Sequence, residues 1–508
     1  MTMNGEVLAF ILYFVVVLGI GIFFFFRSRG GGEKEYFLGG RSMGPWVTAM
    51  SAQASDMSAW LLMGLPGSIL AFGLGQVWIG IGLVLGTAAN WIFVARRLRR
   101  FSKAANDSIT LPQYFTNRFM SNNRGLQVIS AIIFLVFFTV YVASGFVAGT
   151  KVFVTVFPSL DVQWAMILFA AIILLYTFLG GFKAVCWTDF FQGMLMLVAL
   201  LAVPIVLVCG GQTFDSAALS TVYTGADGTA YAFTPNLFSA SWQEVVSGLV
   251  WGLGYFGMPH ILVRFMSIKK SSMIKKSATI AIIWVILSLG SAIALAILGR
   301  MILGGELLPS GAQDTVFIVF VRRLFPSFIA GLLMSAIIAA SMSTADSQLL
   351  VASSSFTSDI YKPLIRKKAS DKELLWVGRL VVLIVAVVAY FIASSKAQGA
   401  QAIMDLVENA WAGFGSAFGP VVILSVFWKR ITYKGAVAGV VGGAVVDVLW
   451  LAFLSSPTGI YELLPGFVAG LLCCIVGSLL DHKPSAEVLA VYERATSASD
   501  SEEEASEE

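Results

Sequence analysis

Charged residues are scarce in this chain of 508 residues. Asp, Glu, Lys and Arg make up only 12% of it, about half of the share that a soluble domain carries. Hydrophobic residues account for 58%, more than a water-soluble core needs, so lipid must solvate much of the chain. Basic residues interleaved with aromatic ones form no block, which removes the usual footprint of nucleic-acid binding.

Histidine and cysteine, which build many metal and nucleophile sites, are also rare. The chain has two histidines and four cysteines. The cysteines all lie in apolar runs without metal-ligand spacing, and we interpret them as small core residues: Cys186, Cys209, Cys473 and Cys474. Because the sequence offers no catalytic constellation, we expect a protein that is not an enzyme and needs no cofactor.

Long apolar runs are what the sequence has in abundance. Runs of about 20 residues predict transmembrane helices, and thirteen of them occur, at about 6–26, 44–72, 76–95, 125–156, 163–182, 187–210, 242–265, 277–303, 326–355, 374–394, 403–427, 435–455 and 461–481. The first run lacks a basic region and a cleavage site, so we expect it to be retained. The fold class predicted is an all-α integral membrane protein.

The distribution of positive charge predicts the orientation. If the spans alternate from an N-terminus outside the cell, 28 of the 33 Lys and Arg residues fall in inside segments. Cytoplasmic loops carry such an excess, which favours an N-out, C-in arrangement. The polar, acidic tail from residue 484 is expected to be disordered.

Two predicted spans contain residues that break helices. Residues 51–67 read SAQASDMSAWLLMGLPG, and residues 247–260 read SGLVWGLGYFGMPH. Polar or irregular backbone at membrane depth is costly unless it lines a cavity. These spans open two successive groups of five, which indicates an inverted repeat with a discontinuous helix at the start of each half. Ordinary glycine and serine packing between helices is the alternative.

The ninth span carries hydroxyl groups on one face. In AASMSTADSQ, residues 339–348, helical spacing brings Ala340, Ser343, Thr344 and Ser347 together. Sodium is a hard cation that takes oxygen ligands, so two hydroxyls with carbonyls from an unwound segment suit it. Alternatively, such hydroxyls bond back to their own helix or pack closely.

Four acids fall within or at the ends of spans: Asp56, Asp189, Asp346 and Asp447. Each costs roughly 2.5–3.5 kcal/mol at a helix centre on insertion scales. Asp56 lies in the broken second span and Asp346 in the hydroxyl-rich ninth, so both are candidates for an ion pathway. Asp447 has no polar neighbours in the sequence and receives no role.

Several stretches together carry a family resemblance. They are YFLGGRSMGP (36–45), SAQASDMSAWLLMGLPG (51–67), TLPQYFTNRF (110–119), FFTVYVASG (137–145), LYTFLGGFKAV with the following WTD (175–189), WGLGYFGMPHILVRFM (251–266), MSTADSQLL (342–350) and AFGPVVILS (417–425). With them, the chain resembles the sodium/solute symporter family, in register from about residue 6 to 485. The resemblance implies a LeuT-like 5+5 inverted repeat in a bacterial cytoplasmic membrane.

The resemblance also divides the chain. It implies a first transmembrane helix and cytoplasmic loop (1–42), a transport core of spans 2–11 (43–427), two additional helices (428–483) and the acidic tail (484–508). It implies sodium-coupled symport of L-proline into the cell, with Na⁺ as coupling ion, membrane lipid as surroundings and no obligate protein partner. Another small solute, such as pantothenate or another amino or organic acid, is the alternative. A channel or sensor is disfavoured, because no filter motif or kinase domain is present.

Site residues follow by resemblance. The implied sodium ligands are the carbonyls of Ala54, Met57 and Ala340 and the hydroxyls of Ser343 and Thr344. The implied substrate site contains Trp60, Gly64, Tyr141, Trp251, Tyr255 and Pro259, and positions tied to coupling are Arg41, Asp56 and Ser58. Aromatic walls suit a pyrrolidine ring and its ammonium.

A second cation site is predicted beside the first. Asp189 and Asp346, with Ser347, are expected to flank it, because a bound cation relieves both the repulsion between two acids and their lost hydration. The alternatives are that Asp346 takes a proton, or that each acid is satisfied by a neighbouring hydroxyl, by water or by the interface. Asp346 and Met258 depart from the residues expected at their positions in the family.

Overall fold

The computed structural model describes residues 5–27, 33–179, 181–396 and 402–497. Most of these residues are helical. The helices are α1 (Gly5–Arg27), α2 (Glu33–Leu38), α3 (Pro45–Asp56), α4 (Gly64–Phe72), α5 (Val77–Ala89), α6 (Arg96–Ala104), α7 (Leu111–Arg118), α8 (Gly125–Val156), α9 (Val162–Leu179), α10 (Phe182–Cys209), α11 (Trp242–Val250), α12 (Pro259–Ser267), α13 (Ile274–Leu307), α14 (Val316–Leu324), α15 (Ser327–Ser354), α16 (Asp371–Lys396), α17 (Ala402–Phe427), α18 (Tyr433–Phe453), α19 (Ser455–Thr458), α20 (Leu463–Leu480) and α21 (Ala486–Ser497). Strands β1 (Tyr223–Thr224) and β2 (Ala230–Tyr231) pair antiparallel in one loop.

Each predicted apolar run coincides with a helix or a broken helix. Within the described ranges, ten helices are long and apolar enough to cross a membrane, and α11 with α12, bent by 44°, makes an eleventh if counted as one span. The predicted second span is the pair α3 and α4, and the predicted fifth span is the shorter α9. The chain is therefore a multi-pass helical membrane protein.

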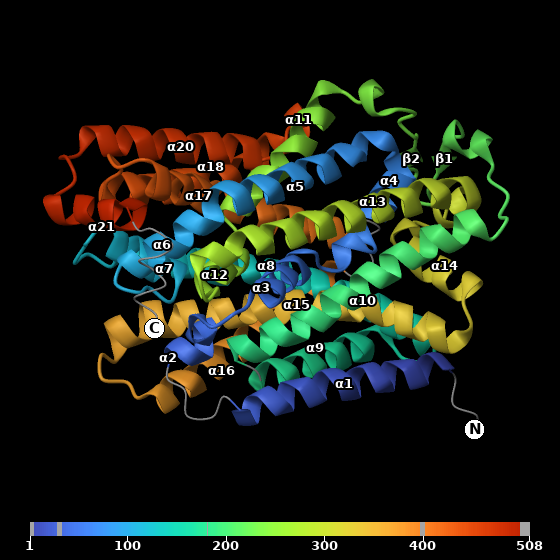
Figure 1. Cartoon of the computed structure of the whole chain (residues 1–508). Helices are drawn as coiled ribbons and strands as arrows, with labels where there is room; N and C mark the ends of the chain where they lie inside the picture. The colour runs from blue at the N-terminus through green and yellow to red at the C-terminus, as the bar shows by residue number, and fades with distance from the viewer. Residues whose placement is uncertain (1–4, 28–32, 180, 397–401, 498–508) are drawn as a thin grey trace.

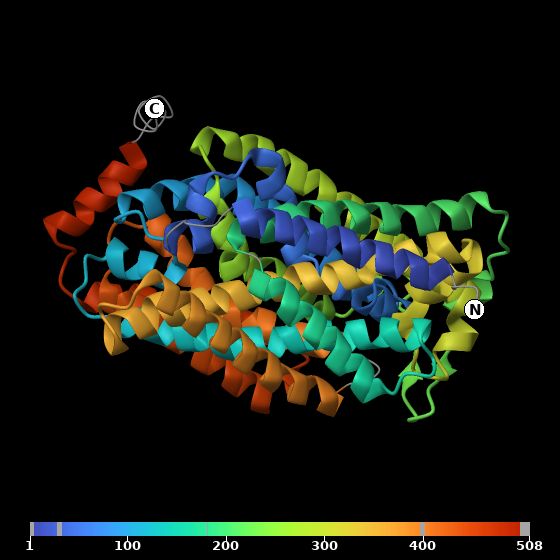
Figure 2. The same ribbon diagram turned by 90° about the horizontal axis from the view of Figure 1, so that it is seen from below.

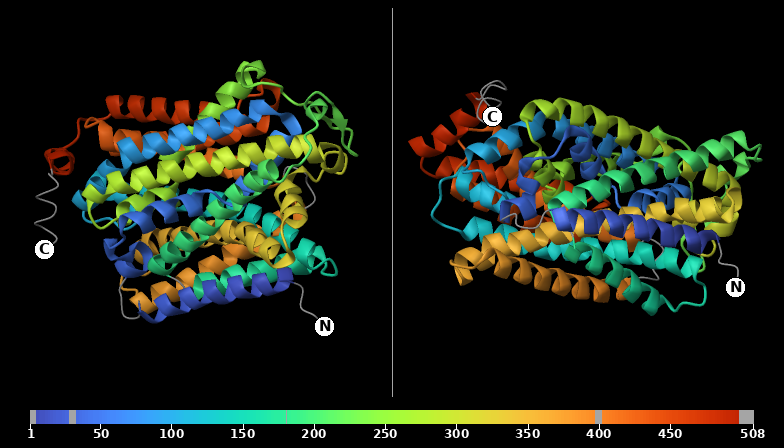
Figure 3. Two further views of the ribbon diagram at one scale, coloured as in Figure 1. Left: turned by 45° about the vertical axis from the view of Figure 1, so that its right-hand side comes forward. Right: turned by 60° about the horizontal axis from the view of Figure 1, so that its bottom comes forward.

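The long helices lie side by side along a common direction (Figures 1 and 2). Helices α2, α6, α7 and α21 gather at one end of the bundle, whereas the β1–β2 hairpin, α14 and the start of α1 lie at the other (Figure 1). Helix α1 runs along one edge, and α18 and α20 lie along the opposite edge (Figure 3). Elements outside spans 2–11 thus flank the bundle.

Both predicted helix breaks are present. Helix α3 ends at Asp56, Met57 adopts non-helical backbone angles (φ −80°, ψ 75°), and α4 begins only at Gly64. Helix α11 gives way to a 3-10 segment, η7 (Trp251–Phe256), before α12 begins at Pro259. Proline suits the first position of a helix because its missing N–H would have no partner there.

Glycines bring helix α5 against the second break. A Cβ atom at Gly82 would lie 2.4 Å from the carbonyl oxygen of Gly248, and one at Gly86 would lie 2.2 Å from that of Gly252. Small residues allow such backbone contact between membrane helices. The position of the η7 segment therefore depends on the absence of side chains here.

We expect Gly86→Ala to lower the midpoint of thermal unfolding in detergent. The added methyl group would meet backbone atoms of Gly252, which cannot rotate away, and overpacking of this kind costs roughly 1–3 kcal/mol. Gly290→Ala in α13 is the matched control, because nothing lies within 4 Å of a Cβ at that helical glycine. Equal midpoints for the two variants would contradict the close packing.

Helix α2 contains three consecutive charged residues, Glu33, Lys34 and Glu35, which we call the α2 charge cluster. Each of them forms an ion pair with a different part of the chain. Glu33 accepts a 2.6 Å hydrogen bond from Ser358 and pairs with Lys362. Lys34 pairs with Asp107, in the loop between α6 and α7, and Glu35 pairs with Lys183 of α10. Partial burial raises the pKa of Asp107, but Lys34 and Arg41 outweigh it and hold that pKa below its ordinary value. The α2 charge cluster thus ties one end of the bundle together.

The prediction of a disordered tail from residue 484 was wrong for the part that the structure describes. Residues 486–497 form α21, which buries Val488, Val491 and Ala495 and receives a hydrogen bond from Arg118 at the Val488 carbonyl (3.3 Å). The spacing of these residues places them on one helix face, a period that the acidic composition obscured. Residues 498–508 lie outside the described residues.

Candidate functional site

The two helix breaks meet at Asp56. Tyr255, in the second break, donates a 2.6 Å hydrogen bond to Oδ2 of Asp56. The backbone carbonyl of Asp56 lies 3.3 Å from the Tyr141 hydroxyl and 3.4 Å from the Trp60 indole nitrogen, which both donate to it. Asp56 is fully buried, and its Oδ1 has no hydrogen-bond partner among the described residues. Asp56 thus connects three other predicted site residues.

Aromatic rings surround this junction. The rings of Trp60 and Trp251 are 6.5 Å apart, and Trp251 stacks on Trp411 (6.3 Å) and on Tyr461 (5.2 Å). The Trp411 indole donates to the Trp251 carbonyl at 2.8 Å. Trp411 and Tyr461 were not among the predicted site residues, although Trp411 lies in a glycine-rich stretch of the eleventh span. These rings offer the flat apolar surface that a small ring-bearing ligand requires.

Gly64 and Pro259 shape the same region. A Cβ at Gly64 would lie 2.9 Å from atoms of Met404, so only glycine fits between α17 and the first break without displacing Met404. Pro259 begins α12, and the buried Met258 precedes it as the N-terminal cap residue. Next to Pro259, the His260 ring contacts the ring of Phe138, centroids 5.7 Å apart, which places it in the packing around Tyr141.

Oxygen atoms converge between α3 and α15. The Ser343 hydroxyl donates to the carbonyl of Ala54 at 2.7 Å and lies 3.2 Å from the carbonyl of Ala340. The Thr344 hydroxyl lies 3.5 Å from the Ala54 carbonyl. Met57 follows in the break itself. Neutral, buried oxygen donors of this kind suit a bare hard cation, so the residues fit the predicted sodium site.

Comparison with known proteins identifies the relationship. The sequence model of the Sodium:solute symporter family matches residues 36–443. The chain belongs to this family. It is 44% identical over 492 residues to "Sodium/proline symporter 2" of Staphylococcus saprophyticus and to "Sodium/proline symporter" of Staphylococcus aureus, covering 94% of this chain and 93% of each relative.

Solved structures show the same fold as this member of the sodium:solute symporter family. A Na⁺-coupled sialic acid symporter in a substrate-bound, outward-open state aligns with a TM-score of 0.70 at 19% identity, covering 95% of this chain and 99% of that one. Mhp1, a nucleobase-cation-symport-1 family transporter, aligns with a TM-score of 0.54 at 15% identity, covering 90% and 98%.

Of the predicted coupling residues of this symporter-family chain, Asp56 lies at the junction and Arg41 lies elsewhere. Ser58 is buried and directly precedes the short 3-10 segment Ala59–Leu61 within the first break. Arg41 donates to Asp107 (2.7 Å), to Ser102 (3.1 Å) and to the Ser108 carbonyl (2.9 Å). The structure therefore places Arg41 with the α2 charge cluster and not beside the sodium ligands.

Asp189, one of the two acids predicted to flank a second cation site, pairs with an arginine. Arg264 donates to Oδ2 of Asp189 at 3.1 Å and also to the Ser347 hydroxyl. Asp346 is buried on α15, one turn beyond Ser343, and Tyr13 is within electrostatic range of both acids. Arg264 was not among the predicted site residues, because it stands at the end of the predicted span 242–265 and resembles a loop cation. Its place five residues after Pro259, in an apolar run, is the signal that could have revealed it.

Asp447 lies outside the site of this symporter-family chain. It accepts a 2.9 Å hydrogen bond from Ser416 of α17, and a Cβ at Gly466 of α20 would lie 3.0 Å from its own Cβ. Its carboxylate is therefore part of the packing among α17, α18 and α20, a role that the sequence left open.

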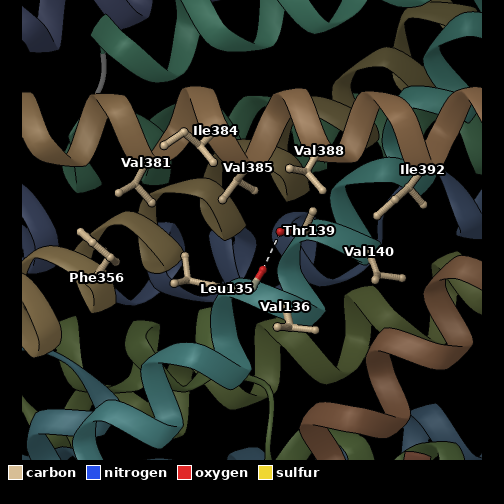
Figure 4. A pocket seen from close by; sticks show the side chains of 10 residues that line it. All are labelled: Leu135, Val136, Thr139, Val140, Phe356, Val381, Ile384, Val385, Val388 and Ile392. Atoms are coloured by element: carbon tan, nitrogen blue, oxygen red, sulfur yellow. Dashed lines mark hydrogen bonds between the residues drawn. The ribbon is translucent and has the colours of Figure 1, made fainter.

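Two cavities differ sharply in chemistry. One, of about 430 Å³, lies between α8 and α16, and its only polar lining residue, Thr139, donates to the Leu135 carbonyl at 2.5 Å (Figure 4). It contains no predicted site residue. The other, of about 290 Å³, is lined by polar and acidic residues such as Glu244 and Glu408 and has Trp251 in its wall. The polar cavity therefore borders the aromatic junction at Trp251.

Proposed function

We propose that the chain is a sodium-coupled symporter that carries L-proline into a bacterial cell by alternating access. The observation that carries the proposal is the convergence of the Ser343 and Thr344 hydroxyls on the Ala54 carbonyl, two residues before the Asp56 junction of the two helix breaks. The relatives named as sodium/proline symporters, alike over 94% of this chain, support proline as the solute. Na⁺ acts as the coupling ion, and no further cofactor is required.

The geometry suggests how the ion and the solute are linked. A sodium ion held by Ala54, Met57, Ala340, Ser343 and Thr344 would fasten the end of α3 to α15. The same end of α3 carries Asp56, whose carboxylate holds Tyr255 of the second break. Sodium would therefore order both breaks and the rings around them, and by linkage the solute would strengthen sodium binding equally.

The proposal includes thirteen spans in an N-out, C-in arrangement, with spans 2–11 (43–427) as a LeuT-like 5+5 repeat and spans 1, 12 and 13 (1–42 and 428–483) around it. The arrangement of the bundle supports this orientation. Helices α6 and α7 lie in the strongly basic segment 96–124, which the proposal places inside the cell. Helix α14 carries Arg322 and Arg323, which the proposal places outside, and it lies at the opposite end of the bundle (Figure 1). Broken or shorter helices account for the spans beyond the ten long ones.

Uptake of labelled proline by purified protein in vesicles tests the function. We expect uptake to require an inward sodium gradient and to rise with a negative interior, because the potential contributes about 2.3 kcal/mol per charge per 100 mV. Equal uptake in choline and sodium buffers would reject sodium coupling. Competition by pantothenate or another amino or organic acid, with none by proline, would reject only the solute.

A further inference from the structure

Arg264 is a buried cation at the position where the sequence predicts a second bound cation. Its side chain is 1% exposed and that of its partner Asp189 is 0% exposed. The guanidinium donates to Asp189 and to Ser347, which are two of the three residues predicted to flank that site. A charge so deeply buried persists only when it is paired and hydrogen-bonded.

Further contacts fix the guanidinium in place. Arg264 donates to the Ser51 hydroxyl at 3.1 Å and to the His260 carbonyl at 2.6 Å, and it lies over the ring of Phe182 at 5.4 Å. Ser51 in turn donates to Oδ2 of Asp189 at 2.6 Å. The arginine therefore connects α12 with α3, α10 and α15, each through a separate contact.

We propose that Arg264 is itself the cation of this second site and excludes sodium from it, so that the protein binds one sodium ion per molecule. Asp189 needs a positive partner in its buried position, and the guanidinium supplies that charge without an ion. The guanidinium also donates to the Ser347 hydroxyl, whose oxygen would otherwise be a sodium ligand. The inference rests on the proposed sodium coupling and adds its stoichiometry.

Neutralising the arginine should convert the site into a sodium site. In Arg264→Gln, Asp189 and Ser347 would keep their oxygen atoms and lose their cation, which is the arrangement that a hard cation fills. We expect equilibrium binding of ²²Na⁺ to purified protein, at saturating proline, to rise from one ion per molecule to two. Arg264→Gln/Asp189→Asn should return to one.

Controls separate this role from general damage. Arg99→Gln removes another buried arginine, on α6, whose guanidinium donates to the carbonyls of Ile268 and Lys269 just after α12, and it should keep one ion. Arg264→Lys keeps a positive charge and should also keep one. If Arg264→Gln does not fold, the number of sodium ions bound by Asp189→Asn decides the question. The proposal expects this variant to bind one.

Two results would overturn the inference: two sodium ions bound by the unaltered protein, or a single ion bound by well-folded Arg264→Gln. A third result would test the proposed function itself. If the unaltered protein showed no saturable sodium binding, sodium coupling would be rejected, and the proposed stoichiometry would be rejected with it. The failure of either claim can therefore be recognised from the same measurement.

Discussion

Ser343→Ala is expected to raise the sodium concentration that half-saturates uptake by about tenfold or more, since a hydrogen-bonding group to a charged partner contributes about 1.5 kcal/mol or more. The Ser343 hydroxyl donates to the Ala54 carbonyl at 2.7 Å. Thr344→Ala, whose hydroxyl is more distant at 3.5 Å, should have a smaller effect in the same direction. Initial rates of labelled proline uptake over a range of sodium concentrations measure both.

Ser335→Ala is the matched control on the same helix. Its hydroxyl donates to the Gly331 carbonyl at 2.9 Å, within α15, so its loss should leave sodium dependence unaltered. An unchanged half-saturating concentration in both Ser343→Ala and Thr344→Ala, with normal protein levels, would show that these hydroxyls do not bind the coupling ion.

Trp251→Ala should weaken proline binding even when sodium is saturating. Trp251 stacks on two rings and forms part of the wall of the polar cavity. An ammonium over a desolvated indole gains about 2 kcal/mol, so the half-saturating proline concentration should rise roughly thirtyfold. Binding of labelled proline to purified protein at high sodium measures the change directly.

Trp164→Ala provides the comparison, because this indole is exposed at the outer surface of α9 and should have no effect on proline. Tyr255→Phe tests the neighbouring bond, since it keeps the ring and removes only the hydroxyl that holds Asp56. Proline affinity that is the same in Trp251→Ala as in Trp164→Ala would exclude the aromatic junction as the solute site.

The helix breaks could be predicted because their cause is local. Proline, glycine and polar residues at membrane depth interrupt helices wherever they occur, and the structure places the breaks at Met57 and at Trp251–Phe256. The hydroxyl face of α15 was equally visible from helical spacing. The contact between this face and Ala54 could be predicted only from the family resemblance, since residues 54 and 343 are remote in the sequence. The binding roles of these residues remain predictions.

Partners brought together only by packing could not be predicted. Arg264 and Asp189 lie on different helices, and nothing near either in the sequence indicates the other. Trp411 and Tyr461 reach Trp251 from spans 160 and 210 positions further along the chain. Sequence patterns identify which residues are costly to bury, whereas the side chain that offsets each cost depends on how the helices pack.

The α2 charge cluster makes one end of the molecule sensitive to ionic strength. Its ion pairs are partly exposed, with Lys34 and Asp107 at 45% and 43%, and each such pair contributes about 0–1 kcal/mol. Dissolved ions screen charges over about 8 Å at physiological salt, so the hold of these pairs on α2 weakens as salt rises. Because α2 ends at Leu38, shortly before α3 begins at Pro45, the salt content of the compartment at that end influences the helix that carries Ala54 and Asp56.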